Sequence, residues 1–117
     1  MIVKSKKPNI LVVCGRNKVR SKTAQYIFRN DQRFNIRSVG LSSKSNRTIN
    51  NNDIIWANLI FVMDHGQRAR LSAFFRELQI PPIEILHIED KYEYLQPELI
   101  EQLTFRINST LKIVYKI

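Results

Sequence analysis

Residues 10–21 read Ile10-Leu11-Val12-Val13-Cys14-Gly15-Arg16-Asn17-Lys18-Val19-Arg20-Ser21. The first four are apolar, continuous and mostly β-branched, which predicts a strand buried on both faces in a parallel sheet. A polar loop follows, and Ala24, Ile27 and Phe28 then fall at helical spacing, which predicts a helix over about residues 21–29. The stretch therefore predicts a strand, a loop and a helix in direct succession.

The rest of the chain continues this alternation of strand and helix. Apolar runs predict three more strands, over residues 34–39, 59–63 and 83–88. Asn50 precedes a short helix, in which Asp53 is placed to favour the positive end of the helix dipole. Two longer helices carry apolar residues on one face: Leu71, Phe74, Phe75 and Leu78 in the first, which Pro81-Pro82 ends, and Leu99, Ile100, Leu103, Ile107 and Leu111 in the second. This order predicts a three-layer α/β/α fold, a four-stranded parallel sheet flanked by helices on both sides.

The length and composition predict one globular domain spanning residues 1–117, with 44% hydrophobic and 25% charged residues. No apolar run is long enough to span a membrane, so we expect no membrane partner. Lys4, Lys6 and Lys7 are not followed by the apolar stretch of a signal peptide. Because Cys14 is the single cysteine, an intrachain disulfide framework and a multi-cysteine metal site are excluded, and we expect a cytoplasmic protein.

The formal net charge of +9 is high for a small enzyme and indicates anionic partners. Phosphorylated substrates, nucleic acid and an acidic protein surface all fit this charge. A solvated basic face that binds no partner fits it equally well. The net charge therefore indicates that any charged partner is anionic, but it does not distinguish between these functions.

The loop between the predicted first strand and first helix has the composition of an anion site. Cys14 lies where the strand ends and Arg20 where the helix begins, with five residues between them. The first N–H groups of a helix lack internal partners, and a run of such groups forms a nest for phosphate oxygens. A thiol at this place should ionise readily to a thiolate nucleophile, and the planar fork of Arg20 can bridge two phosphoryl oxygens. A single cysteine after a buried strand also suits an inert core position, but the spacing of Arg20, Ser21 and Asn17 favours the nucleophile.

This Cys-x5-Arg-Ser arrangement at a strand-to-helix junction resembles the low-molecular-weight protein tyrosine phosphatase family, as a short, divergent member of bacterial type. The likeness covers nearly the whole chain, with Thr23-Ala24-Gln25, Arg37-Ser38-Val39-Gly40 and Asn58-Leu59-Ile60-Phe61-Val62-Met63-Asp64 as further matching segments. The resemblance implies that Asn17 holds a strained loop backbone and that Ser21 donates a hydrogen bond to the thiolate.

The resemblance also implies a general acid in the segment His87-Ile88-Glu89-Asp90-Lys91-Tyr92. Asp90 matches the family's acid, with Lys91 in place of the usual proline, and Tyr92 matches the aromatic residue that flanks the substrate. Glu89, Glu93 and Asp64 are alternative carboxylates for the same role.

The activity implied by the resemblance is hydrolysis of a phosphorylated protein or a small phosphomonoester by double displacement, with no metal or cofactor. Cys14 is the nucleophile, Arg20 binds the phosphate and Asp90 is the general acid and base. The phosphate-binding residues would be Gly15, Arg16, Asn17, Lys18, Val19, Arg20 and Ser21, with Tyr92 beside the substrate.

Two departures from the family bear on the substrate. Arg16 stands where the family usually has glycine, and Lys22 where it usually has proline. Together with Lys18 these residues predict a positive pocket rim and a substrate more negative than an isolated phosphotyrosine. The loop over residues 41–48 also lacks the bulky aromatic residue that often walls the family's pocket.

Two other functions compete with the phosphatase. Arsenate reductases on this fold usually need further cysteines to resolve their covalent intermediate, and this chain has none besides Cys14. A non-catalytic phosphate- or nucleic-acid-binding module would explain the positive charge and the cations Arg16 and Lys18. Such a module would not require Cys14 or a correctly placed Asp90.

Overall fold

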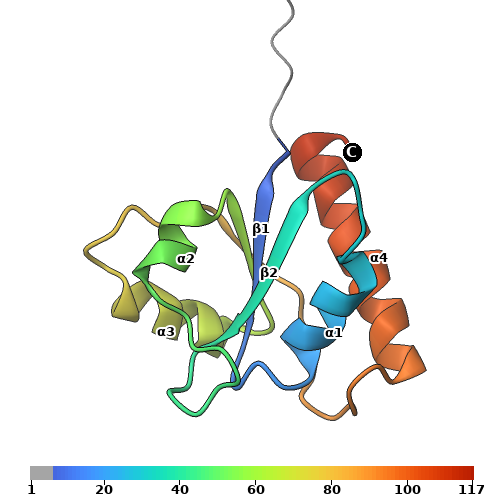
Figure 1. Ribbon diagram of the computed structural model, residues 1–117, viewed down its shortest axis with the longest axis horizontal. Coiled ribbons are helices and arrows are strands. Elements are labelled where there is room, and N and C mark those ends of the chain that lie inside the picture. The colour runs from blue at the N-terminus through green and yellow to red at the C-terminus, as the bar shows by residue number, and fades with distance from the viewer. Residues whose placement is uncertain (1–6) are drawn as a thin grey trace, which may run out of the picture.

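The computed structural model describes residues 7–117, so that Lys4 and Lys6 lie outside the described residues. Strands and helices alternate along the described chain (Figure 1): β1 Asn9–Cys14, α1 Arg20–Phe28, β2 Asn35–Gly40, α2 Asn51–Trp56, β3 Leu59–Val62, α3 His65–Phe74, β4 Ile83–Ile85 and α4 Pro97–Tyr115. This order confirms the predicted alternation.

The four strands form one parallel sheet in the order β2-β1-β3-β4. Strand β1 is central because the chain steps from it to β2 on one side and later to β3 on the other. Strand order therefore reverses beside β1, and parallel α/β sheets bind ligands outside the carboxyl ends of their strands at such a point. Cys14 is the last residue of β1 and pairs with Gly40 at the end of β2.

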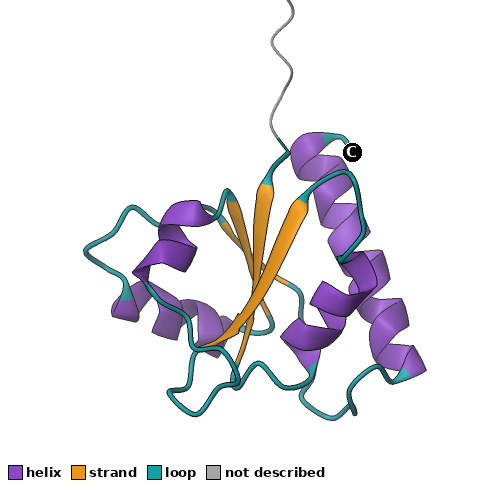
Figure 2. Cartoon of the chain, viewed as in Figure 1, coloured by secondary structure: helices purple, strands orange, loops and turns teal. Residues whose placement is uncertain are grey.

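Residues of β1 alternate between two apolar cores, one on each face of the sheet. Ile10, Val12 and Cys14 pack into the first core, and Leu11 and Val13 into the second. The helix residues that join the first core are Ala24, Phe28, Leu99, Leu103, Ile107 and Leu111, and those that join the second include Ile54 and Leu71. Helices α1 and α4 thus cover one face and α2 and α3 the other, which confirms the three-layer prediction (Figures 1 and 2).

Side-chain caps mark the beginning of two helices, α2 and α3. The short helix predicted after Asn50 is α2, where Asn50 and Asp53 form a reciprocal capping box, and the Asp64 carboxylate accepts from the N–H of Gln67 at α3. Pro97 occupies the first turn of α4. Within residues 7–117, no helix combines the length and the apolar character that crossing a membrane requires.

Strand β4 is shorter than predicted. It ends at Ile85, whereas the apolar run predicts a strand as far as Ile88. The N–H groups of Leu86 and Ile88 still donate to Val62 and Met63, but His87 between them has a left-handed φ of 56°, which breaks the extended backbone. The prediction for residues 86–88 was wrong because apolar content alone does not register such a local reversal.

Helix α3 also ends earlier than predicted, at Phe74 rather than at Pro81-Pro82. Leu71 and Phe75 are buried, but Phe74 is 57% exposed, so its predicted place on the apolar face was wrong. The N–H of Phe75 donates to Leu71 and that of Leu78 to Phe75, which closes the helix in a turn. The spacing of the apolar residues does not distinguish this turn from a continuing helix.

Candidate active site

Residues 14–21, here the Cys14 loop, join the end of β1 to the first turn of α1. Cys14 is 3% exposed and its Sγ lies 2.9 Å from Oγ of Ser21. The thiol forms part of a cavity of about 320 Å³ lined by Cys14, Gly15, Arg16, Lys18, Val19, Arg20 and Asp90. The predicted nucleophile, the predicted phosphate-binding arginine and the predicted acid therefore line one cavity.

The backbone of the Cys14 loop is held by the loop over residues 41–48. Four successive carbonyl oxygens accept hydrogen bonds from it: Cys14 from the N–H of Leu41, Gly15 from the N–H of Ser42 and Oγ of Ser45, Arg16 from the N–H of Asn46, and Asn17 from Nδ2 of Asn46. Within residues 7–117, none of the backbone N–H groups of residues 15–19 donates to another backbone group. With its carbonyls hydrogen-bonded on one side, the loop has these N–H donors available, an arrangement that is able to bind an anion.

The close approach of the two loops requires a glycine at the end of β2. A Cβ on Gly40 would lie 2.0 Å from Oγ of Ser45 and 2.8 Å from the backbone carbon of Arg16. Any larger residue would therefore push the supporting loop or the Cys14 loop out of place. Gly40 was predicted only as the end of a strand, because this contact joins residues distant in sequence.

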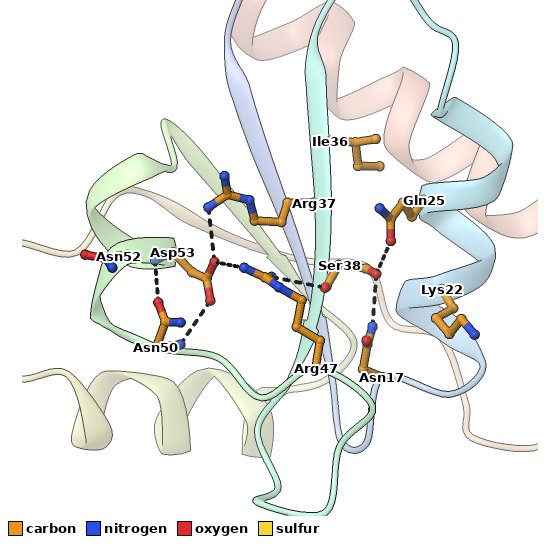
Figure 3. A pocket seen from close by; sticks show the side chains of 10 residues that line it. All are labelled: Asn17, Lys22, Gln25, Ile36, Arg37, Ser38, Arg47, Asn50, Asn52 and Asp53. Atoms are coloured by element: carbon orange, nitrogen blue, oxygen red, sulfur yellow. Dashed lines mark hydrogen bonds and ion pairs between the residues drawn. The ribbon is translucent and has the colours of Figure 1, made fainter.

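Asn17 connects the Cys14 loop to β2. Its φ of 54° is left-handed, a conformation that asparagine tolerates better than most residues. Its Nδ2 donates to Oγ of Ser21 at 2.9 Å. It also donates to Oγ of Ser38 at 3.0 Å, and the Ser38 hydroxyl donates in turn to Gln25 (Figure 3). Ser21 accepts from Asn17, so the Ser21 hydroxyl proton has two acceptors within reach: the Cys14 sulfur at 2.9 Å and the carbonyl of Val39 at 3.4 Å.

Arg20 and Asp90 meet at the edge of the cavity. The Arg20 side chain is buried, and its Nη1 donates to the carbonyl of Ile88 at 2.8 Å. Its Nε lies 3.8 Å from Oδ1 of Asp90, whose side chain is 76% exposed. The carboxylate is thus within reach of both the cavity and solvent, which suits a group that exchanges protons.

Two of the alternative carboxylates, Asp64 and Glu89, line an adjoining pocket that shares Arg20 and Asp90 with the Cys14 cavity. Asp64 caps α3 and Glu89 forms an ion pair of 3.4 Å with Lys91. Of the acids considered from the sequence, Asp90 alone lines the cavity with Cys14.

Of the three cations predicted at the rim of the pocket, two line the cavity. Arg16 and Lys18 are exposed and line the cavity, and neither forms an ion pair with a carboxylate of residues 7–117. Lys22 does not line it: its Nζ lies 5.3 Å from the ring centroid of Tyr94. Two unpaired cations therefore remain at the mouth of the cavity.

Tyr92 is not brought into the cavity. Its ring packs against the first core, and Gln102 of α4 donates a hydrogen bond to its hydroxyl. Tyr92 therefore holds the Asp90 segment against α4 in this structure. Among residues 7–117 no cluster of three side chains suited to bind a metal ion occurs.

Several solved structures are similar to this chain. An arginine phosphatase, YwlE from Geobacillus stearothermophilus, aligns over 91% of this chain and 94% of its own at 18% identity, with a TM-score of 0.64. SP-PTP, a low-molecular-weight protein tyrosine phosphatase from Streptococcus pyogenes, aligns over 92% of this chain and 93% of its own at 14% identity, with a TM-score of 0.72. The tyrosine phosphatase Wzb from Escherichia coli K30, solved in complex with phosphate, aligns over 93% and 99% at 14% identity, with a TM-score of 0.70.

The chain has the fold of the low-molecular-weight protein tyrosine phosphatases. No family model matches the sequence, and no curated protein matches it either. The phosphatase fold is thus retained at sequence identities of 14–18% to these three structures.

The residues whose hydrogen bonds support the Cys14 loop were not identified from the sequence. Ser38, Gln25, Ser45 and Asn46 all make hydrogen bonds there. One available signal was Ser38, a small polar residue inside a predicted buried strand. A second signal was the group of short polar side chains in the following loop, those of Ser42, Ser43, Ser45 and Asn46.

Proposed function

We propose that this protein is a cysteine-dependent phosphatase that hydrolyses phosphomonoesters through a cysteinyl-phosphate intermediate. The observation that carries the proposal is the single cavity lined by Cys14, Arg20 and Asp90, with the buried thiol beside Ser21. The phosphatase fold shared with tyrosine and arginine phosphatases supports the same reaction class. The Cys14 loop would then be the phosphate-binding loop.

In the first step the Cys14 thiolate attacks phosphorus, the sulfur–phosphorus bond forms and the ester phosphorus–oxygen bond breaks. Asp90 gives its proton to the departing ester oxygen. The N–H groups of residues 15–19 and the Arg20 guanidinium bind the equatorial oxygens, where charge is spread in the transition state. Arg20 spends one N–H on Ile88, which leaves others of its five for the phosphoryl group.

In the second step the Asp90 carboxylate takes a proton from a water molecule, whose oxygen attacks phosphorus. The sulfur–phosphorus bond breaks, inorganic phosphate leaves and the Cys14 thiolate is restored. The Ser21 hydroxyl, 2.9 Å from the sulfur, donates a hydrogen bond to the departing thiolate. The carboxyl of Asp90 thus gives up one proton in the first step and regains one in the second.

We propose a phosphorylated protein or a small phosphomonoester as the substrate, in the reducing cytoplasm where the Cys14 thiol persists. The unpaired cations Arg16 and Lys18 favour acidic groups beside the phosphate. They would repel the guanidinium of a phosphoarginine, so we expect phosphotyrosine in an acidic peptide to be preferred over phosphoarginine.

The proposal is tested by p-nitrophenyl phosphate hydrolysis. We expect Cys14→Ser and Arg20→Ala to lower kcat/KM by at least about 10³-fold. Asp90→Asn should lose less, with a changed pH profile. Lys44→Gln, on an exposed residue outside the cavity, is the matched control. Full turnover by Cys14→Ser would refute the mechanism.

One observation favours a second function, a non-catalytic phosphate- or nucleic-acid-binding module: the net charge of +9 together with the exposed Arg16 and Lys18. Binding of that kind weakens steeply with salt. Capture by oligonucleotides at low salt, together with no turnover of any phosphomonoester, would select this function over the phosphatase.

A further inference from the structure

A second polar pocket, of about 430 Å³, lies beside the Cys14 loop and extends across β2 from α1 to α2 (Figure 3). Two arginines, Arg37 of β2 and Arg47 of the 41–48 loop, line it and converge on the carboxylate of Asp53. Nη1 of Arg37 lies 3.1 Å from Oδ1 of Asp53, and Nη2 of Arg47 lies 2.6 Å from the same oxygen. The second carboxylate oxygen accepts from the N–H of Asn50 at 3.0 Å.

Contacts with neighbouring groups orient both arginines. The Asp53 side chain is fully buried, and the Arg37 guanidinium is stacked 4.0 Å from the centroid of the Trp56 ring. Nη1 of Arg47 also donates to the carbonyl of Ser38 at 3.5 Å. Because both guanidinium groups are already oriented, a ligand that bound here would lose less side-chain conformational entropy than at a site of unrestrained surface arginines.

The pair is also incompletely neutralised. Two guanidinium charges share one carboxylate, which leaves one positive charge in excess, and the ammonium of Lys22, which also lines the pocket, adds a second. Each guanidinium carries five N–H donors. Within the described part of the chain, Arg37 uses one of these donors and Arg47 uses two. The Arg37 side chain is 33% exposed and the Arg47 side chain 43% exposed. Donors and charge are therefore available to solvent on the pocket side.

We propose that this pocket is a second phosphate site, distinct from the cavity at Cys14, in which Arg37 and Arg47 bind one phosphate group. Planar guanidinium groups match phosphate oxygens in pairs of parallel hydrogen bonds. Asp53 is a positioning residue: its single carboxylate pairs with both arginines but balances only one of their two positive charges.

The site adjoins the support of the catalytic loop. Asn17 and Ser38 line the same pocket, and Asn17 donates to Ser21, which contacts the Cys14 sulfur. The binding site itself does not depend on turnover at Cys14.

The test is a titration of the wild-type chain with inorganic phosphate, followed by NMR of the arginine Nε–H groups and the backbone amides. We expect the Nε–H signals of Arg37 and Arg47 to shift together and to saturate. Arg47→Gln should weaken the phosphate response of Arg37 by about tenfold or more, the effect of losing one charge-assisted hydrogen bond. Lys44→Gln, which removes one charge from the same loop outside the pocket, should change it by less than about twofold.

Arg47→Gln leaves Asp53 paired with Arg37, so the variant keeps the buried carboxylate compensated. If Arg47→Gln does not fold, Arg37→Gln with the Arg47 signal as readout gives the same test. Arginine signals that stay unmoved by phosphate, or that weaken equally in Lys44→Gln, would overturn the second site. Amide shifts of residues 15–19 and p-nitrophenyl phosphate turnover report on the proposed phosphatase separately, so either can fail alone.

Discussion

Oγ of Ser21 lies 2.9 Å from Sγ of Cys14 and also accepts a hydrogen bond from Nδ2 of Asn17 at 2.9 Å. With the amide as donor to Oγ, the hydroxyl proton of Ser21 can be shared between the sulfur and the carbonyl of Val39 at 3.4 Å, and a thiolate, as the charged and nearer acceptor, would attract it. This relationship ties the reactivity of the thiol to a side chain seven positions along the chain.

Replacing Ser21 by alanine should therefore lower kcat more than it raises KM. Loss of one hydrogen bond to a charged sulfur corresponds to about 1.5–3 kcal/mol, or about ten- to a hundredfold in kcat. Steady-state hydrolysis of p-nitrophenyl phosphate measures this. Ser43→Ala, an exposed serine of the 41–48 loop, is the control and should match the wild type. An unchanged kcat in Ser21→Ala would remove this serine from the mechanism.

Two substitutions at Asn17 separate its backbone role from its side-chain role. Asn17→Gly keeps the left-handed φ of 54° but loses both Nδ2 donors, and Asn17→Ala loses both features. We expect both to lower kcat/KM about tenfold or more, and Asn17→Ala to be about 1 kcal/mol less stable than Asn17→Gly. Urea unfolding and steady-state kinetics measure the two effects. Equal stability of both variants would show that the left-handed backbone costs nothing here.

Substitution of Gly40 should disturb the catalytic loop through sterics alone. A Cβ at this position meets the Arg16 backbone at 2.8 Å, so we expect Gly40→Ala to lose about 1–3 kcal/mol of stability and most of its activity. Gly15→Ala is the matched stability control, because a Cβ on Gly15 meets nothing within 4 Å. Denaturant midpoints for the two variants should differ clearly. Similar midpoints would contradict the packing described for the two loops.

The turn between α1 and β2 should make stability depend on pH. The Arg33 guanidinium, 2.8 Å from Asp31, holds the pKa of Asp31 below its ordinary value of 3.8. A lowered pKa means that the stabilisation is complete above that value and is lost as the pH falls through the folded-state pKa. Arg33 also donates to Asn108 of α4 at 2.7 Å, so the pair anchors the turn to the helix.

Asp31→Asn should accordingly lower the free energy of unfolding by about 0.5–1 kcal/mol at pH 7. The difference from wild type should shrink once the pH is taken below 3.8, the ordinary pKa of Asp31. Urea unfolding at the two pH values measures it, with Glu101→Gln as an exposed control. A difference that is constant with pH would mean that the carboxylate charge has no part in it.

The sequence predicts best those features that residues close together in the chain determine. Cys14, Arg20 and Ser21 belong to one strand, loop and helix, so their spacing alone predicts their positions, and the alternation of apolar runs predicts the sheet and its layers. The end of α3 at Phe74 and the reversal at His87 escape this reasoning because single backbone angles determine them. Periodicity of apolar residues does not encode those angles.

The support of the Cys14 loop is also hidden from the sequence, for a different reason. Cys14 and Leu41 are joined through backbone atoms, which leave no mark on residue type. The direction of Tyr92 likewise depends on its contact with Gln102 across two elements. Such features follow from packing between distant segments, and only the assembled fold reveals them.

The central claim is that Cys14 carries the phosphoryl group during turnover. Rapid quenching of the enzyme with a radiolabelled phosphotyrosine peptide, followed by digestion and mapping, tests it most directly. We predict label on the peptide that contains Cys14 in the wild type and none in Cys14→Ser. Turnover without any labelled enzyme, or label that persists in Cys14→Ser, would contradict a cysteinyl-phosphate intermediate.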